Sequence, residues 1–232
     1  MSILEHDKLT SAGRRSPGIE ALSQPAAEML DFRRKFVIRM GWVDEPYLDD
    51  CDRYDDNPST IHFNSWHESG EVLSGMRLTP LASIEDSLSV DMLATNPVMR
   101  QQALEFGQAI NMAETDVWDL TRLVNRFDDE PLHYESLLSM LGVFGAGLAR
   151  TYPLEGKDLI WLFTTTELMK NHLDAVGILA ETIAQGRINE DETQDSYFCA
   201  IRPIDAMQFL RDNQEQYGFT YQQVDEGLQS VK

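Results

Sequence analysis

The feature of this chain that most constrains its fold is an alternation of strand-like apolar segments with segments of helical periodicity. Two strand-like runs, STIHFNSW at 59–66 and EVLSGMRLTP at 71–80, are joined by HESG, which is typical of a β-hairpin with glycine in its connection. Further strand-like runs at 116–124 and 158–166 are separated by a helical segment. A hairpin followed by such alternation predicts an α/β fold, a three-layer α/β/α sandwich with a mixed central sheet.

The remaining segments complete one compact domain. Apolar residues at helical spacing predict a helix over 26–40, which Gly41 ends. The other predicted helices lie at 99–112, 130–151, 167–176 and 204–213, with further strands at 178–183 and 197–201. The pattern of residues 82–96 favours neither a helix nor a strand. We expect residues 1–25 to be a loose N-terminal extension, 26–216 to be the domain, and 217–232 to be a polar, frayed C-terminal tail.

The charge of the chain limits its partners. Its 19 Lys and Arg residues against 39 Asp and Glu residues give a net charge of −20, which argues against binding to nucleic-acid phosphates or to an anionic membrane surface. Basic residues gather only at 33–39, where they could dock an acidic partner. The apolar run 137–149 is shorter than the roughly 20 residues that span a bilayer. With no signal-peptide pattern at the N-terminus, we expect a soluble, cytoplasmic protein.

Metal and nucleophile motifs do not occur in the sequence. It contains no HExxH, GxSxG or Walker pattern, and Cys51 and Cys199 lack zinc-type spacing. The absence of GxGxxG after the first strand argues against a dinucleotide fold. We interpret the scattered histidines as surface or structural residues and expect neither a metal site nor a cofactor. They are His6, His62, His67, His133 and His172.

An acidic segment, DCDRYD at 50–55, surrounds one tyrosine with carboxylates. A calcium loop of the EF-hand type starting at Asp50 would need glycine at position 6 and glutamate at position 12, where the chain has Asp55 and Ile61. Two interpretations remain: a solvated acidic turn, or a pocket for a cationic ligand with Tyr54 as its aromatic wall.

A second unusual segment, WDLTR at 118–122, places charges inside an apolar strand. Burying Asp119 and Arg122 is costly unless they are paired, so they indicate either an ion pair within the sheet or a functional site. Strict alternation puts them on opposite faces, so pairing requires a β-bulge. Arg77, at the end of the preceding strand, is either an exposed strand end or a member of the same site.

Taken in order, these segments resemble a known family. The residues that carry the resemblance are Phe36 and Trp42; Asp50, Asp52, Tyr54 and Asp55; Gly75, Arg77, Leu78 and Pro80; and Asp119, Thr121 and Arg122. From about residue 26 to about 203 the chain is similar to the acyl-homoserine lactone synthases, the autoinducer synthases of bacterial quorum sensing. It departs from the family pattern at Phe32, where arginine is usual and Arg33 or Arg34 substitutes, and at Asp119, where glutamate is usual.

The resemblance implies a GNAT acyltransferase-like fold and an acyltransferase activity. An acyl group would pass from acyl carrier protein, or from coenzyme A, to the amine of S-adenosylmethionine. Lactonisation would then release methylthioadenosine. S-adenosylmethionine is a substrate in this scheme, and no cofactor is implied.

The resemblance also implies roles for individual residues. The implied catalytic residues are Asp119, Arg122 and Arg77. The implied residues on the S-adenosylmethionine side are Arg33, Phe36, Trp42, Asp52 and Asp55. The implied acyl-pocket residues, one of which could hydrogen-bond a 3-oxo group, are Thr164, Thr165 and Thr166. A carrier-protein dock could use the cluster at 33–39 with Arg150, Lys157 and Lys170; the alternative is that these cations lie on a solvated helix face.

Two alternatives stay open. One is an N-acyl amino acid synthase of the same fold, which needs no sulfonium pocket. The other is a non-catalytic acyltransferase-like domain that binds a metabolite. The short Asp119 side chain and the shifted arginine favour these alternatives, whereas the intact Asp52–Asp55 segment with Arg77 and Arg122 favours the synthase.

Overall fold

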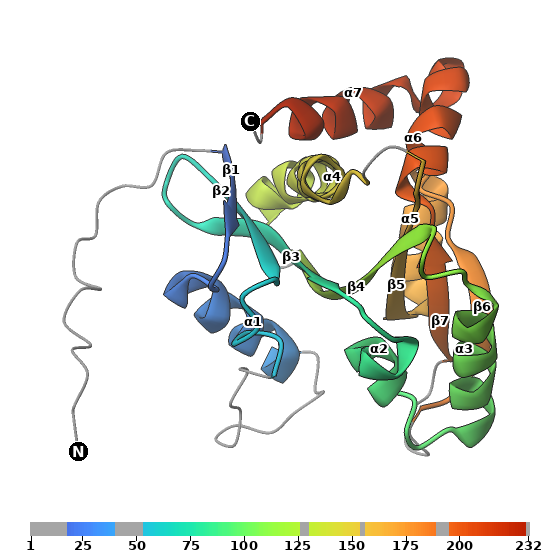
Figure 1. The fold of residues 1–232 in the computed structure, drawn as a ribbon. Coiled ribbons are helices and arrows are strands. Elements are labelled where there is room, and N and C mark those ends of the chain that lie inside the picture. The colour runs from blue at the N-terminus through green and yellow to red at the C-terminus, as the bar shows by residue number, and fades with distance from the viewer. Residues whose placement is uncertain (1–17, 40–52, 126–129, 154–155, 189–194, 231–232) are drawn as a thin grey trace, which may run out of the picture.

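A seven-stranded mixed sheet forms the centre of the molecule, with helices on both faces (Figure 1). The computed structural model describes residues 18–39, 53–125, 130–153, 156–188 and 195–230. The strands run in the order β1-β2-β3-β4-β5-β7-β6. Their bounds are β1 Gly18–Leu22, β2 Ile61–Trp66, β3 Val72–Pro80, β4 Thr115–Asn125, β5 Asp158–Thr166, β6 Glu181–Gly186 and β7 Ser196–Ile201. The helices are α1 Ala27–Arg39, the 3-10 turn η1 Ile84–Asp86, α2 Leu88–Asp91, α3 Pro97–Ala109, α4 Glu130–Thr151, α5 Glu167–Ala175, α6 Pro203–Asp212 and α7 Gln214–Ser230.

The two strands at the centre of the sheet, β4 and β5, pair over only part of their length. β4 and β5 are parallel, and the long helix α4 makes the crossover that a parallel pair requires. Their pairing runs from Thr115↔Asp158 to Asp119↔Leu162. Beyond that point β4 continues along β3, while β5 continues along β7. The two strands therefore leave an opening in the sheet directly after Asp119.

Each face of the sheet has its own core. On one face α4, α5, α6 and α7 pack on side chains that include Trp161, whose ring meets Phe144 edge to face at 4.9 Å. On the other face α2 and α3 pack through Val90, Leu93 and Met99. α1 covers the β2–β3 end of that second face. The predicted three-layer α/β/α sandwich with a mixed sheet is confirmed.

Successive residues of β5 belong to different cores, which explains its continuous apolar sequence. Trp161 and Phe163 enter the α4 side, whereas Ile160 and Leu162 enter the α2–α3 side. A central strand with both faces covered loses the polar alternation of a half-exposed strand.

Glycines allow the two longest helices to approach closely. A Cβ on Gly227 of α7 would lie 2.0 Å from the carbonyl oxygen of Gly142 in α4, and one on Gly145 would lie 1.9 Å from that of Val224. α7 therefore rests backbone to backbone on α4, as the upper part of Figure 1 shows.

The predicted frayed tail after Tyr217 is wrong, because α7 extends to Ser230 and packs on α4. Its buried positions, Thr220, Val224 and Gly227, are too small or too polar to form a visible apolar stripe. The predicted loose extension is also corrected at 18–22, which forms β1 on the edge of the sheet against β2.

Two internal segments also differ from their predictions. β6 begins at Glu181 rather than at 178, because Ile178 is buried just after the left-handed turn at Gly177 and lies outside the strand. Residues 84–91, for which the pattern favoured neither state, form η1 and α2, each capped by a serine side chain.

The close approach of α4 and α7 predicts a position-dependent effect of alanine. Gly227→Ala forces a methyl group into the α4 backbone and should lower the free energy of unfolding by about 1–3 kcal/mol. Gly218→Ala, on the same helix, meets its nearest atom at 3.9 Å and should raise the stability by at most about 1 kcal/mol. Urea denaturation of both variants checks this, and equal effects would contradict the packing.

Candidate active site

A buried ion pair joins the acidic loop to the sheet. The guanidinium of Arg77, on β3, donates from Nη1 to Asp55 Oδ1 at 2.8 Å and from Nε to Thr121 Oγ1 at 2.9 Å. Both charged residues are almost fully buried. A buried pair is tolerated when its geometry is good and its other donors are satisfied. Arg77 is therefore not an exposed strand end, and Asp55 does not lie in a solvated turn.

Two more basic side chains face the same carboxylate. Arg33 Nη1, from α1, and His62 Nε2, from β2, each lie 3.8 Å from Asp55 Oδ1. Arg33 is buried and Arg34 is exposed, so of these two arginines it is Arg33 that faces Asp55 inside the protein. The interpretation of His62 as a surface residue is wrong; the structural interpretation fits its burial in this cluster.

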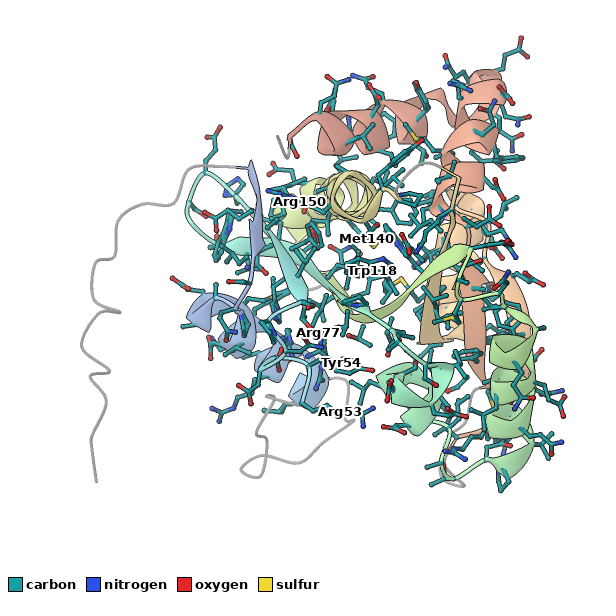
Figure 2. All side chains as sticks on the ribbon, in the orientation of Figure 1. Arg53, Tyr54, Arg77, Trp118, Met140 and Arg150 are labelled. Carbon is teal, nitrogen blue, oxygen red and sulfur yellow. The ribbon has the colours of Figure 1, made fainter. Side chains whose placement is uncertain are left out.

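Two arginine side chains of the protein itself lie over the ring of Tyr54. The guanidinium carbons of Arg53 and Arg77 each lie 5.3 Å from the ring centroid, within the range of cation–π contacts. Figure 2 shows Arg77, Tyr54 and Arg53 following one another below the sheet. The cation–π contacts of Tyr54 in this structure are thus made by the protein's own arginines, and a pocket for a cationic ligand at this loop stays a prediction.

Asp119 is the second buried carboxylate of the site. It lies on β4 at the last position paired with β5, and it is fully buried. Its Oδ2 accepts from Tyr54 Oη at 3.2 Å, from Ser87 Oγ at 3.0 Å and from the Ser89 amide at 3.2 Å. Its Oδ1 accepts from Ser89 Oγ at 2.5 Å. These donors explain how a carboxylate can be buried in this strand without an ion pair.

Burial is the main influence on the pKa of both Asp119 and Tyr54. Burial raises the pKa of Asp119, although the hydrogen bonds from Ser89 and Ser87 act in the opposite direction. Burial and the nearby charge of Asp119 also raise the pKa of Tyr54. The Tyr54 hydroxyl accepts from the Leu88 amide at 2.7 Å and contacts the carbonyl oxygen of Asp86 closely.

Arg122 lies at an irregular point of β4. Its φ of 55° is in the left-handed region, which is uncommon for a residue with a side chain. The register between β3 and β4 shifts here, with Arg77 opposite Thr121 and Gly75 opposite Val124. The bulge that an Asp119–Arg122 approach would require is therefore present. Strained backbone of this kind often marks functional positions.

An apolar pocket lies on the α4 side of the strand opening. Its lining residues are Met76, Leu120, Leu123, Met140, Leu141, Phe144, Phe163, Leu173, Ile178 and Ile201. The remaining cavity is about 10 Å³, roughly the space of one water molecule. Met76 and Met140 are unbranched, flexible side chains that can repack around a guest. Sequence reasoning missed this lining, because its residues come from β3, β4, α4, β5, α5, β7 and the turn before β6 and share no motif.

The three threonines predicted for the acyl pocket have other contacts. Thr164 Oγ1 donates to the Ser89 carbonyl oxygen at 2.8 Å. The Thr166 side chain accepts from the Met169 amide and caps α5. Thr165 is half-buried beside them, and none of the three lines the apolar pocket just described.

Some predicted site residues lie outside the described part of the chain. They are Trp42 and Asp52, and although Phe36 lies within α1, its side chain is also not described. Of the cations predicted for a carrier dock, Lys157 pairs with Asp116 and Lys170 with Asp174. The hydrogen bond that Lys170 Nζ donates to Asp174 raises the pKa of Lys170. Arg150 is exposed near the end of α4.

Among the described residues, no group of three or more His, Cys, Asp or Glu side chains is arranged to hold a metal ion. Within the same ranges, no helix combines the length and the apolar character needed to cross a bilayer.

Comparison with solved structures identifies the fold. TofI in a ternary complex with an inhibitor and MTA aligns with a TM-score of 0.53 at 20% identity, covering 84% of this chain and 97% of TofI. The CoA-dependent acyl-homoserine lactone synthase BjaI, with SAM and isopentyl-CoA, aligns with a TM-score of 0.58 at 13% identity, covering 90% of both chains. The chain has the fold of the acyl-homoserine lactone synthases.

A third synthase agrees with this fold. The AHL synthase LasI aligns with a TM-score of 0.50 at 15% identity, covering 78% of this chain and 88% of LasI. No protein-family model and no curated protein matches the sequence. The predicted acyltransferase-like fold class is thus confirmed by structures that are only 13–20% identical to this chain.

The buried pair predicts a large difference between two arginines that both touch Tyr54. Arg77→Met leaves Asp55 buried without its closest partner and should lower the free energy of unfolding by about 3 kcal/mol or more. Arg53→Met removes a pair with Asp91 whose side chains are 53% and 42% exposed, and should cost about 1 kcal/mol or less. Guanidinium chloride denaturation measures both, and a loss of equal size would argue against a buried site.

The raised pKa of Asp119 predicts the pH dependence of its contribution to stability. The folded state holds the Asp119 proton to higher pH than the unfolded chain, whose aspartates titrate near about 3.9. Between the unfolded pKa and the higher folded pKa of Asp119, the unfolded chain therefore binds fewer protons than the folded protein. The free energy of unfolding falls as the pH rises through this range. The difference in unfolding free energy between the parent protein and Asp119→Asn should shrink with rising pH. A difference that grows would mean that the hydrogen bonds outweigh burial.

Proposed function

We propose that this protein is an acyl-homoserine lactone synthase whose catalytic domain extends from β1, beginning at Gly18, to α7, ending at Ser230. It transfers an acyl group from a thioester to the amine of S-adenosylmethionine, and the methionine carboxylate then closes the lactone and displaces methylthioadenosine. The observation that carries the proposal is the placement of a buried polar cluster and an apolar pocket on opposite sides of the opening between β4 and β5. The shared fold supports it.

The two sides of the opening suit the two substrates. Asp55, Arg77 and Asp119 lie on the α1–α2 side, where a polar, charged substrate can be oriented. The pocket under α4 holds only apolar side chains and suits an acyl chain. Because β4 and β5 stop pairing after Asp119 and Leu162, backbone N–H groups along the opening can stabilise the oxyanion of the attacked thioester.

Asp119 is our candidate for the group that takes the amine proton, either directly or through a water. It lies at the point where the strands separate, and its raised pKa brings it closer to the range in which a carboxylate accepts a proton efficiently. Arg77 and Arg122 would orient and neutralise carboxylates around the reacting groups. Arg33, Phe36, Trp42, Asp52 and Asp55 would hold S-adenosylmethionine, with Trp42 or Phe36 rather than Tyr54 facing its sulfonium.

For the acyl donor we propose acyl carrier protein, with acyl-coenzyme A as the alternative. BjaI is a CoA-dependent synthase with this fold, which supports the coenzyme A alternative. The pairing of Lys157 and Lys170 with carboxylates leaves Arg150 as the exposed cation of the predicted dock beyond α1. We further propose that the enzyme works in the cytoplasm, where S-adenosylmethionine and acyl thioesters are made.

The proposal is tested by mass spectrometry of organic extracts from a bacterial host that expresses the protein, against an empty-vector control. A new N-acyl homoserine lactone would establish the reaction class and the acyl group together. N-acyl amino acids in its place would establish the alternative synthase. With purified protein, methylthioadenosine release is then compared for acyl carrier protein and acyl-coenzyme A donors of matched chain length.

The polar cluster predicts a severe loss of turnover when Asp55 is removed. Asp55→Ala should lower methylthioadenosine release at least about 100-fold, because Arg33 and Arg77 lose the carboxylate that orders them. Asp31→Ala is the matched control; its carboxylate is 56% exposed and pairs only with Lys35 on the same helix. Circular dichroism confirms that each variant is folded, and a fully active Asp55→Ala would refute the site.

A further inference from the structure

Ser89 is in contact with both strands that border the opening in the sheet. On the β4 side its Oγ donates to Asp119 Oδ1 at 2.5 Å, and its amide donates to Asp119 Oδ2 at 3.2 Å. On the β5 side its carbonyl oxygen accepts from Thr164 Oγ1 at 2.8 Å. One almost fully buried residue of α2 thus connects Asp119 to Thr164.

This connection spans the place where the backbone ladder is missing. Asp119 is the last residue of β4 that pairs with β5, and its partner is Leu162. Thr164 follows two positions later and therefore points to the same face of the sheet as Leu162, the face that α2 covers. Among the described residues of β4 and β5, no ladder bond joins the strands beyond Asp119 on this side. The side-chain bridge through Ser89 takes its place.

The segment that carries the bridge depends on such ties. α2 is only four residues long, and so short a helix has little stability of its own. It is held by the Ser87 side chain, which caps the Val90 amide and also donates to Asp119, and by Tyr54, which accepts from the Leu88 amide. Loss of the Thr164 bond would release one end of this network and leave the Ser89 carbonyl without that donor.

We propose that Thr164, Ser89 and Asp119 form a bridge that sets the position of the Asp119 carboxylate and the width of the strand opening. Thr164 is then a positioning residue for the polar side of the site, not a donor to a 3-oxo group on the acyl chain. Its hydroxyl has a single proton, and that proton is given to Ser89. The inference about substrates rests on the proposed synthase function, whereas the bridge itself does not.

The bridge is tested in the ligand-free protein by hydrogen–deuterium exchange with two substitutions at one position. Thr164→Val keeps the shape but removes the hydroxyl, and Thr164→Ser keeps the hydroxyl. We expect exchange of the amides in 87–93 to rise about five- to tenfold in Thr164→Val and to stay near the parent rate in Thr164→Ser. Ser83→Ala is the control for local effects. The Ser83 hydroxyl donates to the Glu85 carboxylate and accepts from the Glu85 amide, both within its own turn. Unchanged exchange in Thr164→Val would overturn the bridge.

The consequence for the site is tested by calorimetric binding of S-adenosylmethionine and methylthioadenosine without any acyl donor. Thr164→Val should weaken binding several-fold, Thr164→Ser should restore it, and the turnover ratio of 3-oxo to unsubstituted acyl donors should stay unchanged. A shifted donor ratio with intact S-adenosylmethionine affinity would make Thr164 an acyl contact and overturn the inference. If the parent protein binds neither ligand, the synthase proposal fails, while the exchange experiment still decides the bridge.

Discussion

The burial of one guanidinium group, that of Arg77, organises the polar half of this molecule. A charge in the middle of a sheet must be matched and its donors satisfied, or the fold loses several kilocalories per mole. Asp55 supplies the matching charge, Thr121 accepts a second bond, and the ring of Tyr54 lies within cation–π distance of the guanidinium. Asp55 and Tyr54 belong to the acidic loop, and Thr121 belongs to the neighbouring strand β4. The contacts that satisfy the Arg77 guanidinium therefore also hold the acidic loop against the sheet.

The hydroxyl of Tyr54 extends this network to the second buried carboxylate. It reaches Asp119 and the start of α2, so the loop, β4 and α2 become one polar unit on one face of the sheet. On the opposite face α4 and α7 approach closely through glycines and close an apolar core. The opening between β4 and β5 is where these two environments meet. The proposed transfer of an acyl group to the deprotonated amine of a charged, polar substrate needs both environments close to each other.

Local patterns predicted those parts of the fold whose neighbours are near in sequence or whose residues are uniformly apolar. The β2–β3 hairpin, the buried strand β5 and the long helix α4 are of this kind. β1 and α7 were missed because β1 is a short, half-exposed edge strand, and α7 packs through Gly227 and Thr220 rather than through large apolar side chains. Arg77 and Asp119 could be singled out in sequence, because a charge within an apolar strand is costly wherever the strand lies. Asp55 could be singled out because it belongs to the acidic segment around Tyr54.

What the sequence by itself determined is therefore the α/β class, the mixed sheet and the short set of charged residues that a buried site must contain. The tertiary structure alone decided their partners. That Arg33 rather than Arg34 faces Asp55, that Arg77 lies over the ring of Tyr54, and that Thr164 bonds to Ser89 all depend on contacts between segments far apart in the chain. The physical reason is that hydrogen bonds and ion pairs act over about 3–4 Å, so their partners follow from the packing of the layers and not from sequence spacing.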